Sequence, residues 1–177
     1  MSLQNACHCN EQLLSELIQA IETLHSEAYQ KPAAPDNPQT IGAHVRHIIE
    51  FYHCFLSGLE SSYINYDNRT RDPECERSVS SAVDTILSIK ECLAKLTTST
   101  LREVNLTFNA NIDTTGNAVN TETSVIRELL FLQSHATHHM AMINLLLQQS
   151  GHSPPKDLGV ATSTLIYRKQ QEASSEN

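Results

Sequence analysis

Histidines in two short segments have the spacing that a divalent metal ion could use. His135 and His139 stand four residues apart in the string FLQSHATHHMAMINLLL. On a helix this spacing places the two imidazoles one turn apart and about 40° apart in direction, so that both can bind one ion. His138 lies about 60° to the other side of His135. It is less well aimed and is kept as an alternate ligand or a supporting residue.

The second segment, TIGAHVRHIIEFYHCF, carries His44 and His47 three residues apart. Both fall on or beside the apolar stripe of Ile48, Phe51 and Phe55, and either one would complete a three-histidine site. Three protein ligands leave a fourth position for water or substrate, which is the arrangement of catalytic zinc. Imidazole also binds Ni, Cu and Fe, so the residues alone do not select the metal.

The same histidines are also compatible with two other kinds of protein. One is a non-enzymatic bundle that binds a metal or a small ligand in a stress response. The other is a helical partner-binding module without metal, whose histidines are core or surface groups. A solvent-accessible metal favours an enzyme, a site closed by a fourth protein ligand favours the first alternative, and absence of metal favours the second.

Amphipathic helices must position these side chains. Apolar residues at three-and-four spacing predict helices over residues 10–29, 40–59, 73–96 and 124–150. Thr40 is a suitable N-cap for the second helix, and Gly151 is suitably placed to end the last one.

Two connecting segments have distinct patterns. In segment 102–124, Val104, Leu106 and Phe108 alternate with polar residues before the turn signal TTGN, which predicts a short β-hairpin. Segment 61–74 is rich in Asn, Asp and Arg, and is expected to lie outside the core.

The order of these elements predicts one all-α domain, a four-helix bundle with a β-hairpin before the last long helix. The domain is expected to cover residues 1–168, followed by a disordered tail over 169–177. Cys7, His8 and Cys9 could bind a soft ion, but they are expected at a frayed terminus and lack a second half with zinc-finger spacing.

Composition excludes several functions. The chain has 177 residues, with 12 Lys and Arg against 20 Asp and Glu. This excess of acidic residues gives no electrostatic attraction for nucleic acid or an anionic membrane. Its apolar runs are too short to span a bilayer. Five cysteines, an odd number, indicate reduced thiols. With no secretory signal at the N-terminus, the cytoplasm is the expected location and a small molecule the expected substrate.

HVRHIIEF in the second predicted helix and ELLFLQSHATHHMAMI in the last resemble the DinB/YfiT-like superfamily of metal-dependent enzymes. The polar string NYDNRTRD resembles one branch of it that has no assigned reaction. The resemblance implies an up-down-down-up four-helix bundle and a metal triad, which falls on His47, His135 and His139.

The resemblance favours His47 over His44 as the ligand from the second helix. The family's ligand there is followed by an apolar residue and then an acidic one, which are Ile48 and Glu50 in this sequence. The helical wheel, in contrast, places His44 slightly nearer the centre of the apolar face. His44 therefore stays as an alternate ligand or as a residue that supports one.

Family members with known roles include thiol-dependent transferases and isomerases, which implies a metal-activated thiolate and a low-molecular-weight thiol as cosubstrate. The ion would be Zn or Ni. Hydrolysis at the same metal is the alternative. A homodimer is also expected, because an amphipathic bundle can pair through a spare helix face.

Other polar residues could serve such a site. Asp67, Arg69 and Arg71 could clamp a substrate carboxylate or act as a base, or they could form a solvated loop with internal Asp–Arg pairs. Glu128 precedes His135 by seven residues, about 10 Å along a helix. At that distance it could orient a neighbour of the site, or pair with another helix.

Overall fold

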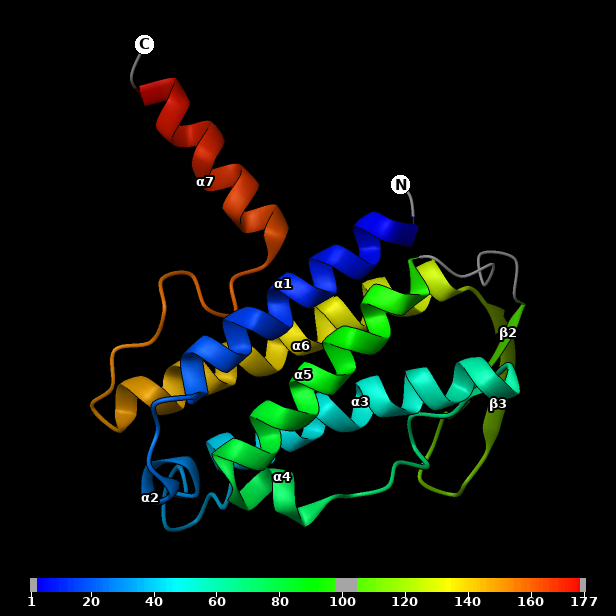
Figure 1. Ribbon diagram of the computed structural model, residues 1–177, viewed down its shortest axis with the longest axis horizontal. Helices are drawn as coiled ribbons and strands as arrows, with labels where there is room; N and C mark the ends of the chain where they lie inside the picture. The colour runs from blue at the N-terminus through cyan, green and yellow to red at the C-terminus, as the bar shows by residue number, and fades with distance from the viewer. Residues whose placement is uncertain (1–2, 98–104, 176–177) are drawn as a thin grey trace.

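Four long helices pack around one core in the computed structural model, which describes residues 3–97 and 105–175 (Figure 1). The four are α1 (Leu3–Ile21), α3 (Ile41–Ser61), α5 (Val79–Leu96) and α6 (Val125–Gln149). Helices α1 and α3 each pack against both α5 and α6, which closes the bundle. In Figure 1, α1 and α6 run one way and α3 and α5 the other, confirming the up-down-down-up bundle.

Side-chain caps set the starts of the two helices that carry the histidines. Thr40 Oγ1 accepts a hydrogen bond from the Ala43 amide at 2.9 Å, and Ser124 Oγ accepts one from the Arg127 amide at 3.3 Å. Each bond satisfies an amide that has no partner within its helix. Gly151, with φ of +81°, follows the end of α6. Because caps are local signals, these helices lie close to their predicted bounds.

The first predicted helix differs from the structure at both ends. It begins at Leu3, ends at Ile21, and is followed by the separate short helix α2 (Ser26–Tyr29). The expectation of a frayed N-terminus is wrong, because Cys7 is fully buried in the core. The apolar contacts of this first turn hold it in place, a tertiary effect that the local pattern did not reveal.

The third predicted helix is divided at Ser78 into α4 (Pro73–Arg77) and α5. Ser78 has an extended backbone, with φ of −118° and ψ of 116°, and its side chain accepts a hydrogen bond from the Ser81 amide. One residue therefore ends α4 and caps α5. The apolar spacing continues across this break, so it predicted one helix.

The predicted hairpin is confirmed as β2 (Leu106–Asn111) and β3 (Ala118–Thr123), which pair antiparallel, while Val104 lies outside the described residues. A further strand, β1 (Tyr63–Ile64), pairs parallel with β2. The expectation that segment 61–74 lies wholly outside the core is therefore wrong for Ile64 and Tyr66, which are both buried.

The C-terminal segment differs from the expected disordered tail. Helix α7 (Thr162–Ser175) extends through most of residues 169–177, and the last two of these lie outside the described residues. Its Lys, Gln, Glu and Ala residues favour helix. None of its residues is buried, and Figure 1 shows it projecting from the bundle. Across the described residues, no helix is long and apolar enough to cross a membrane.

Candidate metal centre

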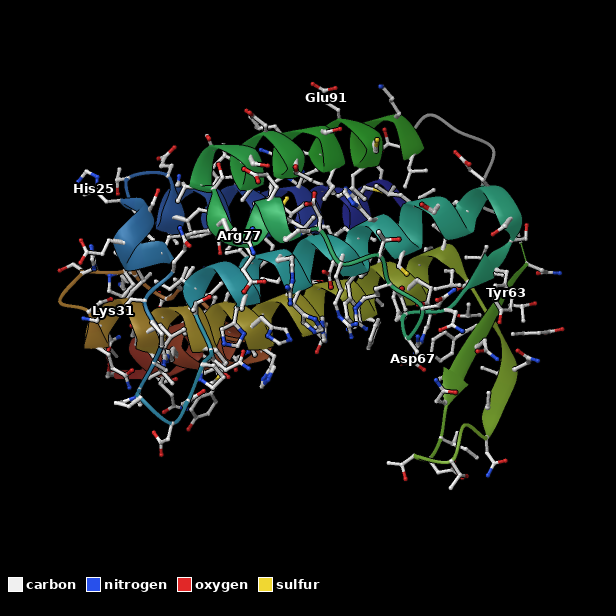
Figure 2. The ribbon with its side chains drawn as sticks, turned by 90° about the horizontal axis from the view of Figure 1, so that it is seen from below. His25, Lys31, Tyr63, Asp67, Arg77 and Glu91 are labelled. Atoms are coloured by element: carbon white, nitrogen blue, oxygen red, sulfur yellow. The ribbon has the colours of Figure 1, made fainter. Side chains whose placement is uncertain are left out.

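Helices α3 and α6 run side by side (Figure 2). Three histidines meet at this seam. His47 comes from α3, and His135 and His139 come from α6. One ring nitrogen of each lies within 4.8 Å of the other two, the only such group of potential metal ligands found in the described part of the chain. Nε2 of His47 is 3.1 Å from Nε2 of His135.

The burial of neighbouring residues explains why these rings stand at the helix seam. Ile48 follows His47 in the chain, Met140 follows His139, and both of these apolar side chains are fully buried. The histidines, next to them on each helix, are only half-buried. The three rings therefore lie at the rim of the core and are partly exposed to solvent.

Removal from water keeps these imidazoles neutral. Burial, together with the nearby positive charge of the other rings and of Arg69, lowers the pKa of His47 and of His135 to about 4. Burial and the other histidines lower the pKa of His139 to about 3. Neutral imidazole is the form that binds metal ions, so the cluster has its ligand form at neutral pH.

The two remaining candidate histidines lie in different environments. His44 is 7% exposed, and its Nδ1 lies 3.0 Å from Nδ1 of His139. Its Nε2 is buried with no hydrogen-bond partner among the described residues. His138 is exposed, and its ring makes an edge-on contact with the ring of His139, with centroids 5.1 Å apart. The structure thus brings His44 to the cluster from the core side and places His138 beside His139 at the exposed edge.

Aromatic rings form one wall of the site, a feature absent from the sequence analysis. Phe51 stacks on His135, with ring centroids 3.9 Å apart, and also on Tyr66, with ring centroids 4.9 Å apart. Phe131 stacks near His135 at 5.7 Å. Phe51 follows His47 by four residues and Phe131 precedes His135 by four, so the helical spacing contained a signal for both.

Arg69 is the candidate from the polar segment that reaches the cluster. Its guanidinium carbon lies 4.8 Å from the centre of the Phe51 ring, and its Nε is 3.4 Å from Oε2 of Glu50. Glu50 is buried and also forms an ion pair with Arg46, whose Nε is 3.1 Å from Oε1. The positive charge of Arg69 contributes to the lowered pKa of His47.

Glu128 lies fully buried in a different hydrogen-bond network. Its Oε2 accepts from the Tyr66 hydroxyl at 2.7 Å, and its Oε1 accepts from Thr123 at 2.6 Å and from Arg127 at 2.7 Å. Burial and the Glu128 carboxylate raise the pKa of Tyr66, so its hydroxyl keeps the donated proton. Glu128 therefore joins α6 to the sheet and to the segment after β1.

Asp67 and Arg71 lie elsewhere on the surface. Asp67 Oδ2 accepts from the backbone amide of Asn111 at 2.8 Å and from its side-chain amide at 3.1 Å. This attaches the polar segment to the end of β2. Arg71 is exposed and forms no ion pair with the described residues. The internal Asp–Arg pairing considered for this segment is therefore not the arrangement found.

A family model described as the DinB family matches residues 3–171. The chain belongs to the DinB family. It is also similar to a solved structure described as "YfiT from Bacillus subtilis is a probable metal-dependent hydrolase with an unusual four-helix bundle topology", at 17% identity and a TM-score of 0.62. That match covers 85% of this chain and 89% of the other, and at this identity it shows a shared fold.

A further relative of this DinB-family chain is a much longer protein. The chain is 31% identical over 109 residues to "FK506-binding protein 5" of Rhizopus delemar. The match covers 61% of this chain but 28% of that protein. The similarity is therefore to one part of the longer chain.

Proposed function

We propose that this DinB-family chain is a metal-dependent enzyme that binds one divalent ion with His47, His135 and His139. The observation that supports it best is the convergence of three imidazoles, one nitrogen from each, within 4.8 Å. His47 is the proposed ligand from α3 because His44 is not a member of this group. Three ligands leave a position for substrate, as in catalytic zinc sites.

The donor set fits a first-row divalent ion such as Zn or Ni. At Zn–N bonds of about 2.0–2.1 Å, two nitrogens of a tetrahedral site are about 3.3 Å apart. Nε2 of His47 and Nε2 of His135 are already 3.1 Å apart. Nitrogen ligands of this kind suit both metals, and the His47–His135 pair already has nearly the spacing that either one needs.

His44 is proposed to orient His139. A metal-binding imidazole commonly donates its second ring N–H to a fixed acceptor, which sets the tautomer and the direction of the ring. Nδ1 of His44, 3.0 Å from Nδ1 of His139, is placed to accept that hydrogen. His138 is exposed and has no comparable position.

The favoured reaction is transfer of a low-molecular-weight thiol to an electrophilic small molecule. The bound ion would lower the pKa of a thiol or of water. Glu50 and Glu128 are both engaged, in ion pairs and hydrogen bonds respectively, so neither is a free general base. A thiol, with a pKa of about 8.5, needs less help to ionise than water, at about 15.7.

In this reaction the thiol proton goes to solvent, a carbon–sulfur bond forms, and the leaving group departs with its electron pair. Arg69, at the edge of the Phe51 wall, is proposed to contact an anionic part of the substrate. The five cysteines of the chain are free, as expected for the reducing cytoplasm in which such thiols occur.

Hydrolysis is the second candidate, since the structurally similar YfiT is described as a probable metal-dependent hydrolase. The same three histidines and the same open position would serve it. In that case water replaces the thiol as nucleophile. The two reactions therefore differ in cosubstrate and not in metal ligands.

Metal content tests the site directly. Tag-free protein, reconstituted with zinc or nickel and dialysed, is measured by mass spectrometry beside a variant with His47, His135 and His139 all changed to Ala. We expect near one equivalent in the parent and little in the variant. His53→Ala is the matched control, because His53 is on α3 but exposed and outside the cluster. Equal metal in parent and triple variant would overturn the site.

Activity then separates the reactions. The metal-loaded protein is assayed with cysteine and monochlorobimane for thiol transfer, and with p-nitrophenyl acetate for hydrolysis. We expect metal-dependent transfer that the triple variant loses. Ester hydrolysis without thiol transfer would instead favour the second candidate. Bound metal with neither activity, across a wider set of such substrates, would favour a non-enzymatic ligand-binding bundle.

A further inference from the structure

Aromatic rings continue from the metal centre toward the β2–β3 hairpin. The chain has four phenylalanines, and three of them, Phe51, Phe108 and Phe131, contact the ring of Tyr66. These four rings are called the aromatic belt. It begins at His135, whose ring centroid is 5.7 Å from that of Phe131, and it ends on β2 at Phe108. Phe108 and Phe131 are only partly buried, so the belt offers flat apolar surface to a ligand.

Arg127 stands at the hairpin end of this belt. It precedes Phe131 by four residues and His135 by eight, so the three lie along one side of α6. Over eight residues, the distance from Arg127 to His135 along the helix axis is about 12 Å. The guanidinium carbon of Arg127 is 5.3 Å from the centre of the Phe131 ring and 5.7 Å from that of Phe108. The belt therefore has imidazole at one end and a guanidinium at the other.

The guanidinium of Arg127 has hydrogen-bonding capacity to spare. Its Nη1 donates to Glu128 at 2.7 Å, whereas its Nε and Nη2 have no hydrogen-bond partner among the described residues. The side chain is 54% exposed. Arginine binds a carboxylate most strongly through two parallel N–H bonds, and Nε and Nη2 form such a pair. Arg127 can therefore bind a carboxylate while it keeps its bond to Glu128.

A groove of about 490 Å³ opens beside this guanidinium, formed by the hairpin and the start of α6. Small-molecule sites commonly have volumes of about 300–1,000 Å³. Phe108 belongs both to the groove and to the aromatic belt, so the two adjoin. The residues that line the groove are Phe108, Thr121, Glu122, Thr123, Ser124 and Arg127.

The acidic residue of this lining, Glu122, is turned away from Arg127. Thr123 faces α6, because its hydroxyl donates a hydrogen bond to Glu128. Successive side chains of a strand point to opposite faces of the sheet, so the side chain of Glu122 is on the other face. Glu128 itself is fully buried. The groove therefore presents a cation to a ligand, without an exposed carboxylate on the same side.

We propose that the groove and the aromatic belt bind a planar aromatic carboxylate. Arg127 holds the carboxylate through Nε and Nη2, and the ring of the ligand lies along Phe108 and Phe131 toward His135. Pairs of aromatic rings are favourable beyond the area that they bury, which selects an aromatic acid over an aliphatic one. This proposal rests on the proposed function, since it names the substrate class of the same site, an aromatic acid whose reacting carbon lies nearest the histidines.

Arg69 is less suited to hold this carboxylate. Its side chain is 17% exposed, and its Nε and Nη1 are engaged by Glu50 and by the carbonyl of Tyr66. It lies over Phe51, at the histidine end of the belt. The two arginines would therefore contact different parts of one substrate, Arg69 near the metal and Arg127 at the hairpin.

Binding of 2-naphthoate tests the proposal without the metal or the reaction. The tag-free full chain is titrated in the presence of a chelator, and the Kd is measured by the fluorescence of the probe. The neutral analogue 2-naphthamide is titrated in the same way. We expect the parent to bind 2-naphthoate more tightly than 2-naphthamide. Arg127→Gln should weaken 2-naphthoate about tenfold and leave 2-naphthamide unchanged, because only the carboxylate uses the charged hydrogen bonds.

Two further variants separate the charge from the rings. Arg168→Gln is the matched control, because Arg168 is 52% exposed and also forms an ion pair, with Asp157. It should bind both probes like the parent. Phe131→Leu should weaken both probes alike, because it removes a ring of the belt and leaves the guanidinium in place. Circular dichroism checks that every variant is folded.

Several outcomes would overturn the proposal. They are a parent that does not bind 2-naphthoate, an Arg127→Gln variant that keeps the preference for the carboxylate, and a preference that Arg69→Gln removes instead. Because neither metal nor thiol enters this measurement, its result is independent of the metal-content test. A chain that binds 2-naphthoate through Arg127 but holds no metal at the three histidines would refute the proposed function and leave the aromatic-acid site standing.

Discussion

Two polar sites along α6 differ in whether their buried atoms have partners. Glu128, near the start of the helix, accepts hydrogen bonds on both oxygens from Tyr66, Thr123 and Arg127. His139, three turns further along, faces His44, whose Nε2 has no partner among the described residues. Buried polar atoms are normally paired. The difference fits a Glu128 network that serves the fold and a histidine cluster that holds the proposed metal.

This comparison predicts opposite responses to substitution. Changes in the Glu128 network should lower the free energy of unfolding and leave metal affinity alone, because all its bonds are internal to the protein. Changes in the histidine cluster should lower metal affinity and leave the free energy of unfolding no lower, since an unpaired buried nitrogen costs stability instead of supplying it. The experiments below test this contrast.

The largest expected effect is stabilisation by metal. An ion at about a thousand times its Kd raises the free energy of unfolding by about 4 kcal/mol, because it binds the folded chain alone. Urea unfolding with and without zinc measures this in the parent. The variant with His47, His135 and His139 changed to Ala should show no such gain. A gain of the same size in that variant would place the metal elsewhere.

The next effect is loss of the Glu128 carboxylate. Glu128→Ala leaves the buried hydroxyl of Tyr66 and the half-buried hydroxyl of Thr123 without this acceptor, and should lower the free energy of unfolding by about 3 kcal/mol. Urea unfolding of the metal-free protein measures it. Glu128→Gln keeps one acceptor oxygen and should lose less. An unchanged stability in Glu128→Ala, or a changed zinc affinity, would remove the contrast between the two groups.

The sequence predicted what local signals determine. The last helix was expected from 124 to 150 and runs from Val125 to Gln149, because Ser124 caps it and Gly151 ends it. The spacing of His135 and His139 on that helix is equally local. The three-histidine site also needed the family resemblance, since helix spacing alone left His44 and His47 as alternatives.

The remaining features depend on contacts between distant residues. Strand β1 has two residues and exists because Tyr63 and Ile64 pair with β2 more than forty residues later. Tyr66 is buried against Phe51 of α3, so its polar neighbours in sequence misled the prediction. Composition cannot show which helix faces meet, and therefore could not place Arg69 beside the histidines or Asp67 away from them.

A smaller effect is expected at His44, and it separates orientation from stability. His44→Phe removes the acceptor facing His139, so zinc affinity, measured by competition with a chelator, should fall about tenfold. The metal-free protein should be no less stable, because the substitution also removes a buried nitrogen without a partner. His44→Asn, which restores a polar acceptor, should recover part of the affinity. If His44→Phe binds zinc like the parent, His44 does not orient His139.

The smallest effects concern the two polar-segment residues that lie away from the cluster. Asp67→Ala removes two hydrogen bonds from exposed Asn111 and should lower the free energy of unfolding by about 0.5 kcal/mol, with faster hydrogen exchange at the Asn111 amide. Arg71 forms no ion pair with any described residue, so Arg71→Ala should change the free energy of unfolding by less than Asp67→Ala does. Both variants should bind zinc like the parent, because neither residue touches the histidines. A loss of turnover in Arg71→Ala at unchanged zinc affinity would show that Arg71 contacts the substrate, and the functional region would then extend from the histidine seam along the polar segment.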